Sequence, residues 1–133
     1  MEQLIRTVLS KYSGYDAEAK LLNRWLQNRE NPEIRQALTL LELKITAVQS
    51  WFNLLNADER FVVQKHLIDE LEWARVAFEF MDRWKMEISR TERTLGQYQA
   101  SAIRKIIAFC EIHKDIVLAL FGDLREDTKD NPN

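Results

Sequence analysis

Apolar residues recur three and four positions apart along most of the chain, which is the spacing of one face of a helix. The longest series follows Asn31-Pro32-Glu33, a start signal with a capping asparagine, a proline for the first helical position and an acid in the first turn. A long central helix is therefore predicted. Its apolar seam alternates four and three apart over three heptads and consists of Ile34, Leu38, Leu41, Ile45, Val48, Phe52 and Leu55.

This seam has two interpretations. It is either the spine of a monomeric bundle, packed against the helices before it, or a contact between two copies of the chain, as a reader of two DNA half-sites requires. A second apolar row beside the seam includes Ala37, Leu40, Trp51 and Leu54. The central helix is therefore expected to have more than one neighbour.

Two shorter helices are predicted before the central one. The first covers residues 2–12, is amphipathic, and is expected to end at Ser13-Gly14. Asp16 has the character of an N-cap for a second helix that runs through Leu26. Residues 1–55 are thus predicted to form a helical arm and the oligomerisation region.

Three further helices are predicted in the second half. Asn56 and Glu59 form a variant capping box for a helix over 57–68, a helix over 71–84 follows, and Ser89 caps a helix over 89–107. This is the order of a helix-turn-helix domain, which we expect over 56–122. The polar tail, 123–133, is expected to be disordered. A last apolar stripe before it consists of Ile112, Ile116, Val117, Leu120 and Phe121.

The helix over 89–107 has two different sides. Leu95, Tyr98, Ala102 and Ile106 are spaced to face a core. Arginine and glutamine on the other side carry the forked donors and acceptors that read base edges in a DNA major groove. The plainer interpretation is the solvated face of an ordinary bundle helix. The polar side consists of Arg90, Arg93, Thr94, Gln97, Ser101 and Arg104.

Composition favours an all-α fold: of 133 residues, 46% are hydrophobic and 30% charged, with only three glycines and two prolines. The formal net charge of -2 means that any DNA contact must come from a local patch. Cations do outnumber acids over 83–108. The preceding segment is acidic and is a candidate surface for RNA polymerase or another basic partner. Its acids are Asp58, Glu59, Asp69, Glu70, Glu72, Glu79 and Asp82.

Catalytic and metal chemistry has little support in the sequence. Cys110 cannot form an internal disulfide, which fits a reducing cytoplasm, and the N-terminal segment lacks the apolar core of a signal peptide. Cys110 and His113 are spaced to share a metal ion, but a zinc site needs four ligands and only His66 remains. No nucleophile-base spacing, phosphate loop or dinucleotide motif is present. We therefore expect no enzyme activity, no cofactor and no metal.

The second half resembles region 4 of sigma factors. The segments that carry the resemblance are LLNADERFVVQKHLIDELEWARVAFEF and ISRTERTLGQYQASAIRKII. More narrowly, they are similar to the ArpU/RinA-type regulators of phages and prophages, small proteins with a helical arm and a sigma-like DNA-binding end that activate late packaging and lysis genes. One departure is the segment 81–88, which is longer than the usual turn and has no glycine. Matching positions include Leu55, Glu59, Arg60, Val63, Trp73, Val76 and Ala77.

The resemblance implies a sequence-specific transcriptional regulator in the bacterial cytoplasm that binds double-stranded DNA. A second copy of the chain is the partner that the seam suggests, and RNA polymerase is the partner that the acidic segment suggests. Arg90, Arg93 and Gln97 are predicted to contact base edges, and Thr91 lies in the same DNA-facing helix. The alternative function is a helical protein-binding adaptor without DNA-binding activity. The residues predicted to hold phosphate are Lys85, Ser89, Thr94, Arg104 and Lys105.

Overall fold

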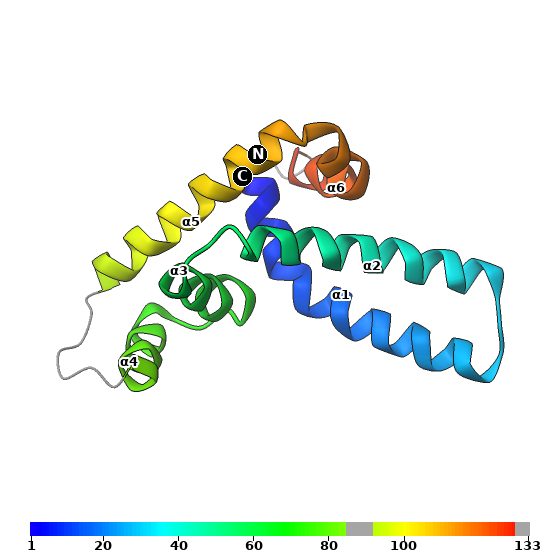
Figure 1. The fold of residues 1–133 in the computed structure, drawn as a ribbon, viewed down its shortest axis with the longest axis horizontal. Helices are drawn as coiled ribbons and strands as arrows, with labels where there is room; N and C mark the ends of the chain where they lie inside the picture. The colour runs from blue at the N-terminus through cyan, green and yellow to red at the C-terminus, as the bar shows by residue number, and fades with distance from the viewer. Residues whose placement is uncertain (85–91, 130–133) are drawn as a thin grey trace.

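The computed structural model describes residues 1–84 and 92–129, and nearly all of these residues are helical (Figure 1). No strand occurs in the described ranges, so the predicted all-α fold is confirmed. The elements are α1 (Glu2–Asn28), α2 (Pro32–Phe52), α3 (Ala57–Val62), the π-helical segment η1 (Val63–Ile68), α4 (Trp73–Trp84), α5 (Glu92–Ile112) and α6 (Lys114–Lys129).

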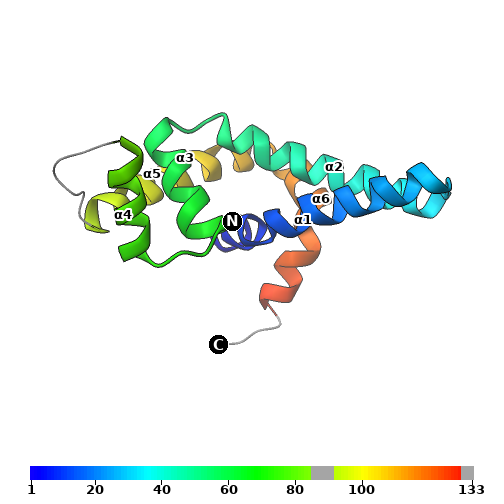
Figure 2. The same cartoon turned by 90° about the horizontal axis from the view of Figure 1, so that it is seen from below.

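Helices α1 and α2 lie side by side as a long hairpin whose tip projects from the rest of the molecule (Figures 1 and 2). The break predicted at Ser13-Gly14 and the N-cap predicted at Asp16 are both wrong, because α1 continues through all three residues as a single helix. A glycine inside a helix costs only about 1 kcal/mol. Tyr12 and Tyr15 on either side pack against Phe52 and Phe121, and this burial outweighs the local preference for a turn.

The seam of the central helix is used within the chain. Leu38, Leu41 and Val48 are buried in one core with Val8 and Leu26 of α1. The first interpretation of the seam, the spine of a single-chain bundle, is therefore correct. The seam itself is not available for a second copy, so any dimer has to use another face.

Both predicted capping signals of this region are confirmed. The Asn31 side chain accepts hydrogen bonds from the backbone amides of Glu33 at 2.9 Å and Ile34 at 3.2 Å. Asn56 accepts from the Glu59 amide, and Glu59 accepts from the Asn56 amide, each at 2.9 Å. These bonds satisfy amides that a helix start leaves without intrahelical partners, and so they define where α2 and α3 begin.

The helix predicted over 57–68 changes from α to π geometry at Val63. Its end is marked by the bond from the Asp69 amide to the Gln64 carbonyl, at 2.8 Å. Glu70 then has a φ of 58°, an uncommon conformation for a side chain other than glycine or asparagine. This tight corner turns the chain into α4, which begins at Trp73, two residues later than predicted.

Helices α5 and α6 are longer than the sequence pattern indicates. Ser89, the predicted cap of α5, lies outside the described residues. Helix α6 runs to Lys129, and so it extends into the tail predicted to be disordered from residue 123. The buried Leu124 extends the series of Val117 and Phe121 by one more turn, which anchors the helix. Ile112 and Ile116 of the predicted stripe are exposed instead.

The main hydrophobic core takes residues from α1, α2, η1, α5 and α6. The boundary predicted between residues 55 and 56 therefore does not separate two cores, and α1 packs against both η1 and α5. A smaller cluster of Val62, Val76, Phe80 and Leu95 joins α3, α4 and α5. Across the described parts of the chain, no helix has the length and apolar character needed to cross a membrane.

Candidate nucleic-acid interface

Helix α5 presents an exposed polar stripe away from the cores. Arg93, Gln97 and Arg104 are all exposed and lie at positions i, i+4 and i+11, which places them on one line along the helix. Leu95 and Ala102 are fully buried on the opposite side. Within the described part of the chain, neither guanidinium group forms an ion pair. The stripe is thus open to solvent and to a large partner.

The other predicted residues of this helix have different surroundings. Thr94 is half-buried and has an interaction partner within the chain. Lys105 was expected to hold phosphate, but its ammonium group lies 2.7 Å from Oε1 of Glu59 in an internal ion pair. Thr94 and Lys105 share the side of α5 that faces α3. The predicted contacts Lys85, Ser89, Arg90 and Thr91 lie outside the described residues.

Glu59 is the centre of a polar contact between α3 and α5. Its side chain is only 2% exposed. Oε1 accepts from the Asn56 amide and from the Lys105 ammonium group, and Oε2 accepts from the Ser101 hydroxyl at 2.6 Å. Burial tends to raise the pKa of Glu59, but hydrogen bonds from Lys105, Ser101 and Asn56 outweigh it and hold the pKa below its ordinary value. The carboxylate is therefore ionised and fully bonded at neutral pH.

This contact determines which side of α5 points outward. Ser101 and Lys105 are four residues apart, so both lie on the same side of the helix, and both bond to one carboxylate. A rotation of α5 about its axis would break both bonds at once. Glu59 therefore acts as a positioning residue for the Arg93, Gln97 and Arg104 stripe.

The acidic segment before α5 has fewer carboxylates available to a basic partner than its composition indicates. Glu59 is buried, and Glu79 is half-buried near Arg75 at 3.8 Å and Lys65 at 4.0 Å. The exposed acids that remain in this segment are Asp69, Glu70, Glu72 and Asp82.

A second contact that joins these helices was missed at the level of sequence. The ring of His66 stacks on Trp73 with centroids 3.7 Å apart, and its Nδ1 lies 2.6 Å from Oε1 of the buried Gln99. Because an amide oxygen only accepts, Nδ1 donates in this bond. His66 thus links η1, α4 and α5, which fits a positioning role. The only available signal was a histidine and a glutamine at apolar-face positions, 33 residues apart.

The thiol of Cys110 belongs to the main core. Its side chain is buried, and burial, with a smaller effect from Glu111, raises the pKa of the thiol to about 12. His113 is exposed and packs against Phe109, with ring centroids 4.5 Å apart. In the described ranges, no three side chains among His, Cys, Asp and Glu form a group that could hold a metal ion.

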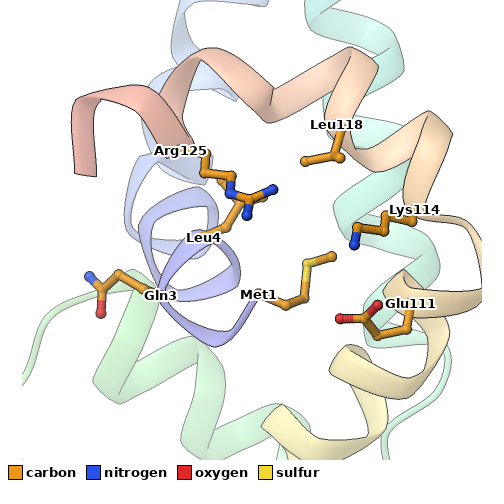
Figure 3. A pocket seen from close by; sticks show the side chains of 7 residues that line it. All are labelled: Met1, Gln3, Leu4, Glu111, Lys114, Leu118 and Arg125. Carbon is orange, nitrogen blue, oxygen red and sulfur yellow. The ribbon is translucent and has the colours of Figure 1, made fainter. Parts of the chain in front are cut away.

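A cavity of 360 Å³ lies at the far end of α5, where α1 begins and α6 starts (Figure 3). Met1, Leu4 and Leu118 supply apolar surface. The charged side chains of Glu111, Lys114 and Arg125 come from α5 and α6. The remaining lining residue is Gln3, so this lining contains no nucleophile-base pair. The polar stripe of α5 thus remains the better candidate site.

Comparisons of the chain with family models, curated proteins and solved structures found no match.

Proposed function

We propose that the protein is a sequence-specific DNA-binding transcriptional regulator, an activator of phage or prophage late genes that works as a homodimer in the bacterial cytoplasm. The observation that carries this proposal is the exposed row of Arg93, Gln97 and Arg104 along one straight helix. The order α3 with η1, then α4, then α5 agrees with a helix-turn-helix arrangement in which α5 enters the major groove.

Each side chain of the stripe has a role that suits its chemistry. Arg93 and Gln97, nearer the start of α5, read base edges, because arginine pairs with guanine and glutamine with adenine through two hydrogen bonds each. Arg104, about three turns along, holds a backbone phosphate. The net charge of -2 makes this local patch, and not the whole molecule, the source of attraction to DNA.

The contact of Glu59 with Ser101 and Lys105 also supports the DNA-binding proposal. Glu59 neutralises Lys105 and fixes the rotation of α5, so Arg93 and Arg104 are the cations of α5 without an ion pair to a described residue. A DNA reader needs side chains held on a rigid element, because a loosely held helix cannot discriminate between bases. RNA polymerase is a further partner in this proposal, contacted by the exposed acids around the corner at Glu70.

The test begins with selection of bound duplexes from fragmented phage and host genomic DNA. Fluorescence anisotropy with a selected duplex then measures affinity as a function of salt. We expect Arg93→Ala to weaken specific binding by about 1–3 kcal/mol, and Arg104→Ala to lower the salt slope by about 1.

Two control variants make this test specific. Lys11→Ala removes an exposed cation from α1, far from the stripe in sequence, and should leave the salt slope unchanged. Lys105→Met removes the neighbour of Arg104 and should lower stability without lowering the slope, since its ammonium group is occupied by Glu59. If no genomic duplex binds even at low salt, the DNA-binding proposal is wrong and the adaptor function takes its place.

A further inference from the structure

The outer part of the α1/α2 hairpin carries a large uncovered apolar surface. Leu21 is 65% exposed, Trp25 58%, Leu40 46% and Leu43 53%. These four side chains expose roughly 400 Å² in total, taking about 150–250 Å² for each fully exposed large side chain. A patch of this size on a single chain commonly marks an interaction site.

The hairpin geometry places most of this surface on one face. The residues of α1 that face α2 include Val8, Tyr15 and Leu22. Leu21 and Trp25 lie to one side of this row. Because α2 runs antiparallel to α1, Ala37 and Leu40 lie on the same side of the hairpin. Leu43 extends the patch around the outer side of α2.

The same face is already a packing surface nearer the base of the hairpin. There, Phe121 of α6 packs against Tyr15 of α1 and Trp51 of α2. The uncovered patch continues this interface toward the tip, beyond the aromatic contacts made by α6.

A shallow groove along α2 matches the side chain that projects from α1. Its volume is 560 Å³, and Ala37 and Leu40 lie between Leu43 at one end and Glu33 at the other. The exposed Arg24 precedes Trp25 in α1, about 100° around the helix, and Glu33 lines the groove, so the contact would bring residues of opposite charge to its edge. The tip thus offers an exposed apolar ring and the groove an apolar floor, but both belong to the same face of one hairpin, which prevents them from meeting within one chain.

We infer that this face binds a second copy of the chain, with Trp25 of each protomer seated in the α2 groove of its partner. The arrangement is reciprocal, as a two-fold dimer requires. A standard interface covers about 800 Å² per partner, a little over half of it nonpolar, which is close to the apolar area exposed here. Four helices then form a bundle at the hairpin tips. This inference does not rest on DNA binding.

Sedimentation equilibrium of the full chain tests the inference. We expect a dimer for the unmodified protein, and a dissociation constant raised at least about 30-fold by Trp25→Glu or Leu40→Glu, as for residues central to an interface. Ile112→Glu and Ile116→Glu alter side chains that are 78% and 61% exposed on other elements and should leave the dimer intact. Circular dichroism verifies that each variant is folded.

A charge exchange gives an independent measure of the same contact. Arg24→Glu alone should weaken the dimer, and the double variant Arg24→Glu with Glu33→Arg should restore it. A protein that is monomeric at high concentration, or a dimer that survives both Trp25→Glu and Leu40→Glu, would overturn the inference. A dimer that meets these expectations but binds no DNA would refute only the proposed function.

Discussion

Helix α6 joins the hairpin through aromatic rings, whereas α3 joins α5 through charged and hydroxyl groups. In the first contact, Phe121 lies 5.8 Å from Trp51 and 6.4 Å from Tyr15 between ring centroids. In the second, one carboxylate of Glu59 bonds to Ser101 and Lys105. The ring of Phe121 and the carboxylate of Glu59 are both buried, but the two contacts have different effects on the fold.

Apolar packing stabilises in proportion to buried area and has weak directional preference. Hydrogen bonds to a single carboxylate are directional and fail over a few tenths of an ångström. The aromatic contact therefore stabilises the packing of α6 on the hairpin, and the polar contact fixes the rotation of α5 about its axis. The proposed DNA interface lies on α5, whose rotation is fixed by directional hydrogen bonds. Recognition of DNA bases requires such a fixed orientation.

The largest expected effect comes from breaking the aromatic contact. Phe121→Ala removes a fully buried ring, and we expect the free energy of unfolding to fall by about 3–5 kcal/mol, because a cavity remains beside Trp51. Urea denaturation at pH 7 and pH 5 measures this. The loss should be equal at the two pH values, since no titrating group is changed. Ile116→Ala on the exposed side of α6 is the control, and an equal loss there would contradict the assignment.

Breaking the polar contact should have a smaller effect that depends on pH. Glu59→Gln keeps the shape but loses charge-assisted bonds to Lys105 and Ser101, so we expect a loss of about 2–3 kcal/mol at pH 7. The folded protein holds the pKa of Glu59 below its ordinary value of 4.5, so this carboxylate stabilises the fold above pH 4.5. That contribution is lost as the pH falls through the lowered pKa.

The difference in stability between the unmodified protein and Glu59→Gln should therefore be full at pH 6–7 and shrink below pH 4.5. Denaturation curves across this range measure it. Asp115→Asn, at an exposed acid in the first turn of α6, is the control and should change stability by less than about 0.5 kcal/mol. A difference that stays constant down to pH 3 would show that the charge of Glu59 is unimportant.

Features with a local cause were predicted well from the sequence. Asn31 and Asn56 cap helices because the amides they satisfy are two or three residues away, and the heptad seam of α2 needs only its own spacing. The local pattern also predicts a break at Gly14. This prediction is wrong, because the packing of Tyr12 and Tyr15 on either side stabilises a continuous helix. Local capping signals are therefore correct at Asn31 and Asn56, where a helix does begin, and wrong at Asp16, where burial keeps α1 continuous.

Features that depend on residues far apart in the chain could not be predicted from the sequence. Lys105 follows Arg104, and both were assigned to DNA, but a helix turns 100° per residue and so directs Lys105 toward α3. Its partner Glu59 is 46 residues away, and nothing in the pattern connects the two. Arg93, Gln97 and Arg104 needed no such partner, and they are exposed as predicted.

The smallest expected effect concerns a polar group within the aromatic contact itself. Tyr15 is buried, and its hydroxyl has no hydrogen-bond partner among the described residues. Burial, and secondarily the nearby Asp123, raise the pKa of Tyr15, so the hydroxyl stays protonated and uncharged well above neutral pH. Burying a hydroxyl without a partner costs about 1–3 kcal/mol, so Tyr15→Phe should stabilise the protein by about 1 kcal/mol.

Thermal and urea denaturation of Tyr15→Phe measure this gain, with Tyr12→Phe as the control, since the hydroxyl of the half-buried Tyr12 is not among the buried groups without a partner. The Tyr12 variant should change stability by less than about 0.5 kcal/mol. A loss of stability in Tyr15→Phe would mean that the hydroxyl is hydrogen-bonded in solution and that the contact beneath α6 is partly polar. A gain would identify nonpolar packing as the basis of the α6 contact, in contrast to the directional bonds that hold α5.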